Sequence, residues 1–143
     1  MSEPLKEAAG SFSIRRLEEL GPVRQWLNAE LNSHRYNPHD TFAVRTGFEE
    51  AVTNAIAHGN AGDANRAAAI DLAVGESKVE ITIEDEGPGF DAARLEDPTV
   101  EKNLLKESGR GVMLIRSFMD EVHYNGEGNR VRLVKYRSDS TPS

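Results

Sequence analysis

Two strand-like stretches, separated by the three residues Gly75-Glu76-Ser77, restrict the folds open to this chain more than any other feature. Residues 67–74 and 78–85 combine apolar side chains with alternation at every second position. That alternation is typical of a strand with one buried face, and so short a connection joins antiparallel neighbours. The sequence therefore predicts an antiparallel hairpin whose apolar face is covered by other elements of the chain.

The part of the chain before this hairpin predicts one strand and two helices. Residues 11–16 alternate polar and apolar side chains and are expected to form the strand. Residues 34–38 interrupt a first helical pattern, and a second helix is expected from about residue 40 to residue 57, where residues 59–62 end it. The first helix is indicated by apolar residues at helical spacing, namely Leu17, Leu20, Val23, Leu27 and Leu31.

The part after the hairpin predicts a surface segment, one helix and two more strands. Residues 90–107 hold a proline, scattered charges and weak helical periodicity, which indicates a segment able to act as a lid. A helix is expected over residues 111–119, and strands over residues 121–124 and 130–136 on either side of a turn. We therefore predict an α/β (α+β) two-layer sandwich, in which a mixed, mostly antiparallel sheet carries helices on one face.

The 143 residues fit one domain with one core, because no long Pro/Gly/Ser linker divides them. We expect the folded domain to span residues 11–137. A disordered N-terminus over residues 1–10 and a disordered tail over residues 138–143 are expected on either side of it.

Composition excludes several classes of protein. Cysteine is absent, which excludes disulfides, thiolate metal sites and thiol catalysis. The net charge of −7 argues against a surface that binds the phosphate backbone of nucleic acids. Only 38% of the residues are hydrophobic, and the polar N-terminus lacks the apolar centre of a secretory signal. We therefore expect a cytoplasmic protein that binds neither nucleic acid nor a membrane.

A polar stripe along the second predicted helix is the first motif that could carry chemistry. Glu50, Asn54 and His58 follow one another at intervals of four residues, so they share one helical face. A carboxylate there can serve as a general base, and a carboxamide oxygen is a suitable ligand for Mg²⁺. A solvated face of an amphipathic helix would show the same pattern. His58 is suited to lie near a ligand or simply to end the helix, where the dipole favours a cation.

Two glycine-rich segments supply the second and third motifs. Asp85-Glu86-Gly87-Pro88-Gly89 directly follows a predicted strand, so Asp85 is placed to accept a hydrogen bond from an amine such as that of adenine. Ser108-Gly109-Arg110-Gly111 precedes a predicted helix, whose free amides and dipole favour phosphate. Each segment alone is also compatible with an ordinary turn or helix entry, and Arg110 with either a phosphate contact or solvent.

Taken in this order, the three motifs resemble those of the GHKL superfamily of ATPases over roughly residues 12–136. EEAVTNAIAHGN resembles the N-box of that family and DEGPGF its first glycine box, while SGRGVMLIRSFMDEV resembles the second glycine box of the anti-sigma serine kinases. The resemblance implies the Bergerat ATP-binding fold, with ATP and Mg²⁺ as cofactors.

The same resemblance implies roles for individual residues. Glu50 would be the base that activates the nucleophile, Asn54 the Mg²⁺ ligand and Asp85 the adenine contact. Asn129 stands where the family usually has a threonine, so a carboxamide replaces the hydroxyl there. Residues 91–107 match the ATP lid, and the remaining nucleotide-binding positions would be Gly87, Gly89, Ser108, Gly109, Arg110, Gly111 and Asn129.

Within that superfamily, histidine kinases, gyrase and MutL carry further domains for which 143 residues leave no room, so the resemblance favours the small anti-sigma branch. It implies a serine protein kinase acting on an antagonist of the anti-anti-sigma, STAS type, with a sigma factor or other regulator as a second partner. The alternative is a non-catalytic module that binds ATP or ADP and sequesters a regulatory protein. Relatives often dimerise, so a homodimer is among the expectations.

A metal-dependent hydrolase is a third interpretation, and it would use the histidines. His34, His39 and His58 include no pair three or four residues apart on a helix, which is the spacing that such a metal site needs. The sequence therefore disfavours this interpretation.

Overall fold

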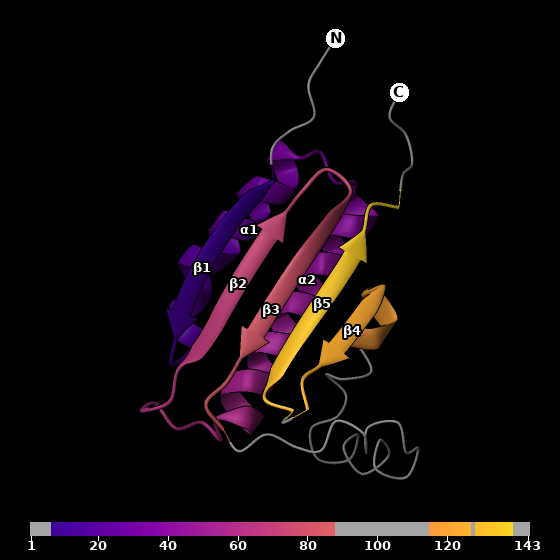
Figure 1. Cartoon of the computed structure of the whole chain (residues 1–143). Coiled ribbons are helices and arrows are strands. Elements are labelled where there is room, and N and C mark those ends of the chain that lie inside the picture. Colours follow the sequence, from indigo (N-terminus) through magenta and orange to yellow (C-terminus); the bar gives the residue numbers. More distant parts are fainter. Residues whose placement is uncertain (1–6, 88–114, 127, 139–143) are drawn as a thin grey trace.

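The computed structural model describes residues 7–87, 115–126 and 128–138 as a two-layer arrangement of one sheet and a layer of helices (Figure 1). Five strands form the sheet in the order β1-β2-β3-β5-β4. The strands are β1 (Ala8–Ile14), β2 (Ala68–Val74), β3 (Lys78–Glu84), β4 (Glu121–Tyr124) and β5 (Arg130–Tyr136). The labelled helices are a 3₁₀ turn η1 (Leu17–Leu20), α1 (Gly21–Ser33), α2 (Pro38–Thr53) and the π-helical η2 (Asn54–Gly59). The described residues 115–118, which belong to the helix expected over residues 111–119, are also helical.

The predicted two-layer sandwich is confirmed, and so is the hairpin on which it rests. β2 and β3 pair in antiparallel register, with Leu72 opposite Ile81, and the Gly75 amide donates to the carbonyl oxygen of Lys78 at 2.9 Å. The sequence predicted a mixed, mostly antiparallel sheet, and in the described ranges every strand pairing is antiparallel.

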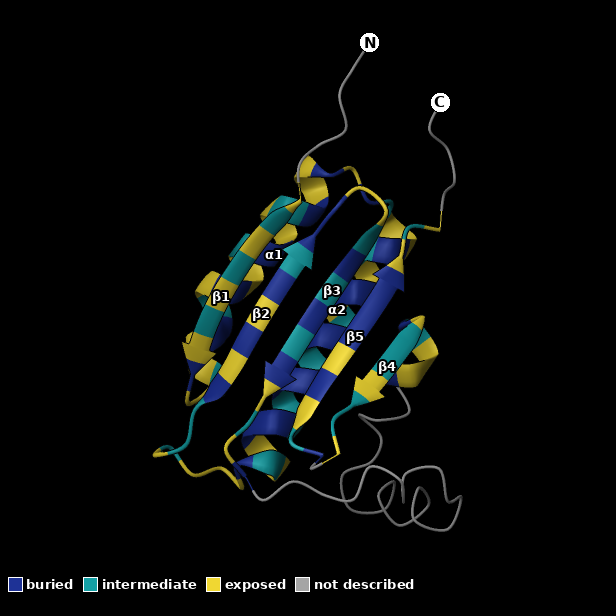
Figure 2. Ribbon diagram, in the orientation of Figure 1, coloured by how far each residue is buried: buried dark blue, intermediate teal, exposed yellow. Residues whose placement is uncertain are grey.

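Helices cover only one face of the sheet, which explains the alternating burial along the strands (Figure 2). Ile70, Leu72 and Ile81 point into the core, where they meet α1 and α2. The opposite face carries polar and charged residues such as Asp71 and Glu80. Burial of one apolar face therefore fixes the register, because a slip by one residue would bring the polar face into the core.

The first strand starts earlier than the sequence predicts. β1 spans Ala8–Ile14 instead of residues 11–16, and residues 8–10, assigned to a disordered N-terminus, pair with β2. Ala8 lies opposite Val74, the last residue of β2. The extension pairs backbone groups along the whole length of β2, which would otherwise lack partners on that side.

The second helix also differs from its predicted bounds. α2 begins at Pro38, with Asn37 as the N-cap residue whose side chain accepts from the Asp40 amide. Proline suits this position because it needs no hydrogen bond from its nitrogen. The α-helix ends at Thr53, and the chain continues as η2 to Gly59 instead of ending near residue 57.

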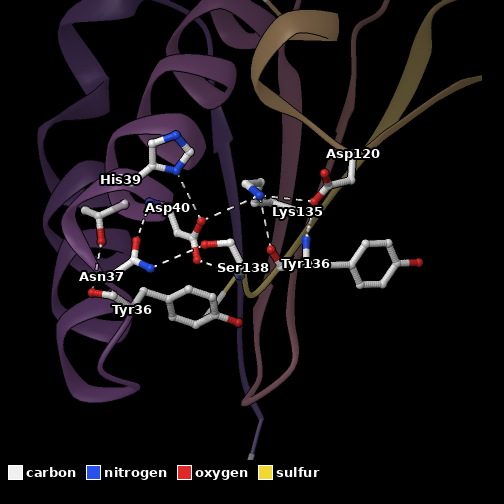
Figure 3. A network of polar contacts seen from close by, with 9 residues as sticks. Tyr36, Asn37, His39, Asp40, Asp120, Lys135, Tyr136 and Ser138 are labelled. Atoms are coloured by element: carbon white, nitrogen blue, oxygen red, sulfur yellow. Dashed lines mark hydrogen bonds and ion pairs between the residues drawn. The ribbon is translucent and has the colours of Figure 1, made fainter. Parts of the chain in front are cut away.

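A buried charge network joins the start of α2 to the end of β5 (Figure 3). The Asp40 carboxylate has no exposed surface and accepts from the Ser138 amide at 2.8 Å. The ammonium group of Lys135 lies 3.6 Å from Asp40 and 3.2 Å from the carboxylate of Asp120. The network ties the last described residues of the chain to the helix layer.

None of the helices in the described ranges is both long and apolar enough to span a lipid bilayer.

Candidate functional site

One end of the sandwich gathers residues from three separate parts of the sequence. β3 leads into Asp85, and the Asp85 amide donates to the carbonyl oxygen of Asn129 at 2.9 Å, just before β5. The end of η2 lies against the same loop, because Gly59 is in close contact with the Asp85 carboxylate. Two predicted nucleotide contacts, Asp85 and Asn129, are thus adjacent, next to the C-terminal end of the helical segment that carries Glu50 and Asn54.

Gly59 and Gly87 approach each other so closely at this end of the sandwich that neither position has room for a side chain. A Cβ atom added at Gly87 would overlap the carbonyl oxygen of Gly59, and one added at Gly59 would overlap the carboxylate of Asp85. Because the first obstacle is backbone, it cannot be relieved by rotating a side chain. Glycine at position 87 therefore allows the loop of residues 85–87, called the Asp85 loop below, and η2 to approach each other.

We predict that Gly87→Ala destabilises the fold by about 1–3 kcal/mol, the range typical of overpacked sites, and weakens nucleotide binding more strongly. Urea denaturation and ATP titration of the variant measure the two effects. Gly21→Ala is the matched control, since a Cβ there meets nothing within 4 Å. A Gly87→Ala protein as stable as the control variant would contradict the close packing.

Asn60, which the sequence suggested only as one of the residues that end a helix, holds the loop in place. Its side chain is buried at 1% exposure, and its Oδ1 accepts from the Glu86 amide at 2.8 Å. Its Nδ2 donates to the carbonyl oxygen of Ala67 at 3.2 Å. Asn60 therefore links η2, the start of β2 and the Asp85 loop. An asparagine after a glycine gives no sign of such a role, since both are common where helices end.

The carboxyl group of Asp85 is electrostatically unusual. Burial is the main reason why its pKa lies above the usual range, and the negative charge of Glu84 adds to the effect. The Gly87 amide, which donates to Asp85 Oδ1 at 2.9 Å, and the charge of Arg66 act in the opposite direction. A partly desolvated acceptor of this kind is suited to a specific hydrogen bond with a neutral donor such as an amine.

The predicted polar stripe runs from α2 into the π-helical η2. Glu50 belongs to α2, whereas Asn54 begins η2 and His58 lies near its end. His58 is exposed in the last turn, which fits the role of a residue at a helix end. Glu50 and Asn54 are both half-buried. π-helical turns are frequent at functional sites, where they reposition side chains.

The described residues can contribute to an Mg²⁺ site through one neutral ligand. They contain no group of three His, Cys, Asp or Glu side chains that could hold a metal ion by themselves. Asn54 offers a carboxamide oxygen from the start of η2. Mg²⁺ usually takes few protein ligands and completes its shell with phosphate oxygens and water, so this arrangement fits the ion.

Several predicted site residues lie outside the described ranges. These residues, which therefore stay predictions, are Gly89, Ser108, Gly109, Arg110 and Gly111, together with the lid over residues 91–107.

Comparison with known proteins gives consistent matches. The family described as the histidine kinase-like ATPase domain matches residues 15–135. Curated relatives named anti-sigma F factor, from Bacillus thuringiensis (strain Al Hakam), Bacillus cereus (strain AH187) and Bacillus anthracis (strain A0248), are each 38% identical to the chain over 102 residues. The similarity covers 68% of this chain and 70% of each relative.

Proposed function

Because the chain belongs to the family of histidine kinase-like ATPases and anti-sigma factors, we propose that it is an ATP-binding, anti-sigma-type regulator with serine protein kinase activity. Its substrate would be an antagonist of the STAS type, and its second partner a sigma factor or another regulator. The observation that carries the proposal is that the Asp85 loop contacts both Asn129 and Gly59, the end of the helical segment that carries Glu50 and Asn54. The proposal includes a cytoplasmic location and a homodimer.

Each residue of the site has a separate task in this function. Asp85 accepts a hydrogen bond from the exocyclic amine of adenine, and Gly87 lets the backbone approach the nucleotide. Asn54 supplies an oxygen ligand to Mg²⁺, which neutralises phosphate charge when it is bound. Glu50 accepts the proton of the attacking serine hydroxyl. Gly89, Ser108, Gly109, Arg110, Gly111 and Asn129 complete the nucleotide pocket in this proposal.

The raised pKa of Asp85 predicts a dependence of ATP affinity on pH. The ionised carboxylate is the acceptor, so affinity falls as the pH drops through the pKa of the free protein. The loss begins at a higher pH than for an ordinary aspartate, whose pKa is about 3.9. Calorimetric titrations from about pH 8 down to about pH 4, close to the ordinary aspartate pKa, measure it, with Asp85→Asn as the control that also reports the titration of ATP itself. Equal pH profiles for the two proteins would remove Asp85 from adenine recognition.

A label-transfer assay tests the kinase itself. The protein is incubated with γ-labelled ATP, Mg²⁺ and purified STAS-domain proteins, and the label is traced to a serine. Label on that serine, absent when the serine is replaced by alanine, supports the proposal. ATP binding without any transfer would replace the kinase by the alternative function, a non-catalytic ATP- or ADP-binding module that sequesters its partner.

A further inference from the structure

A hollow of about 580 Å³ lies between α1 and α2 on their solvent-exposed side. Phe42, Thr46 and Glu50 line it from α2, at intervals of four residues that place them along one face of the helix. Arg24 lines it from α1. The proposed catalytic base therefore lies in the wall of this hollow, called the groove below, on the same helical face as Phe42.

Phe42 is the apolar part of this groove. Its side chain is 61% exposed, more than the other large exposed hydrophobic residue in the described ranges, Tyr136 at 44%. The ring of Phe118 meets it edge-on, with ring centroids 5.5 Å apart and an interplanar angle of 82°. This contact leaves most of the surface of the Phe42 ring open. An exposed aromatic ring beside a groove is typical of a binding anchor.

Some charged side chains of the groove are paired with one another, and others have no ionic partner among the described residues. Arg24 donates two hydrogen bonds to the Glu49 carboxylate, at 2.6 and 2.7 Å, so this pair is internally neutralised. Arg45 also lines the groove, and in the part of the chain that the structure describes no carboxylate lies within ion-pair distance of it. The groove thus offers one available cation close to Phe42 and one available carboxylate at Glu50.

We propose that this groove is the docking site for the serine-bearing segment of the protein substrate, an inference that rests on the proposed kinase function. The segment places a large apolar side chain on Phe42 and an acidic side chain at Arg45, while its serine reaches Glu50. Positions 42 and 50 are separated by about 12 Å along the helix axis, since each residue adds about 1.5 Å. An extended chain advances about 3.3 Å per residue, so the apolar residue lies about three or four positions from the serine.

Peptide binding tests this inference apart from catalysis. Each probe is a fluorescein-labelled polyalanine peptide that contains one serine, one leucine and one aspartate. The leucine lies three or four positions before or after the serine, and the aspartate stands next to the leucine. A non-hydrolysable ATP analogue and Mg²⁺ are present. We expect the best leucine peptide to bind at least about tenfold more tightly than its leucine-to-alanine control. Phe42→Ala should abolish this preference, and Arg45→Glu should abolish the contribution of the aspartate.

Two controls keep the test specific. Tyr136→Ala removes the other exposed large aromatic side chain and should bind the peptides like the parent protein. Phe42→Ala should keep the unfolding temperature and ATP affinity of the parent, because an exposed side chain contributes little to stability.

The outcomes separate the docking site from the kinase. Equal affinity for leucine and alanine peptides, or an unchanged preference in Phe42→Ala, would overturn the docking site even if a serine becomes phosphorylated. Leucine-dependent binding without phosphorylation would retain the docking site and remove the kinase. A dimer of the parent protein that dissociates in Phe42→Ala, measured by sedimentation, would assign the groove to a second copy of the chain and overturn the inference.

Discussion

Glu50→Gln is expected to lower phosphoryl transfer to the protein substrate by about 10²–10⁴-fold, the usual contribution of a general base, while ATP affinity stays close to that of the parent protein. Glutamine keeps the size and polarity of the side chain but cannot accept the serine proton. Single-turnover transfer from labelled ATP measures the rate, and calorimetry measures the affinity. Glu50 is half-buried in the wall of the groove, and since glutamine has the same size, the substitution should leave the packing of α2 unchanged.

The neighbouring Glu49 is the matched control for this prediction. Its carboxylate is occupied by the Arg24 guanidinium, whereas no donor to Glu50 occurs among the described residues. Glu49→Gln should therefore retain transfer within a few-fold of the parent rate. The reverse result, with Glu49→Gln inactive and Glu50→Gln active, would show that Glu49 and not Glu50 is the general base.

The second large effect is expected for stability, from Asp40→Ala. The substitution leaves Lys135, which is 7% exposed, with one ionic partner instead of two and removes the acceptor for the Ser138 amide. Breaking a buried ion pair from one side costs about 3–5 kcal/mol, and the remaining contact with Asp120 places the expected loss near the lower limit. Urea denaturation measures it. Asp120→Ala, at the more exposed end of the network, should cost about 1 kcal/mol or less.

The network also predicts how stability depends on pH. Burial alone would raise the pKa of Asp40, but the hydrogen bonds from Ser138 and the charge of Lys135 outweigh it and lower the pKa. A lowered pKa in the folded state means that Asp40 stabilises the fold above its unfolded pKa and loses that contribution as the pH falls through the folded value. The stability difference between the parent and Asp40→Ala should therefore shrink at acid pH. A constant difference would show that the charge of Asp40 is not what stabilises the fold.

Features with a local signature in the sequence were predicted correctly. The β2–β3 hairpin follows from alternation and a short turn, and the first helix from its repeated leucines, so the two-layer architecture could be predicted from the sequence. The position of Asp85 directly after a strand was also visible, because glycine and proline after an apolar stretch mark the point where a strand ends.

Features that depend on contacts distant in sequence could not be predicted. Nothing between Asn54 and Gly59 indicates a π-helix, and this stretch ends in close contact with the Asp85 loop. The pairing of Glu49 depends on Arg24, a residue of another helix. Lys135 follows two buried apolar residues of β5, and only the fold brings it to Asp40.

A calorimetric titration of the protein with ATP and Mg²⁺, beside the Asp85→Ala variant, tests the central claim most directly. We predict saturable binding by the parent protein and loss of that binding in the variant, with both proteins folded by circular dichroism. A folded parent protein that binds no ATP would contradict the account, because the family fold would then be present without the nucleotide site that we assign to it.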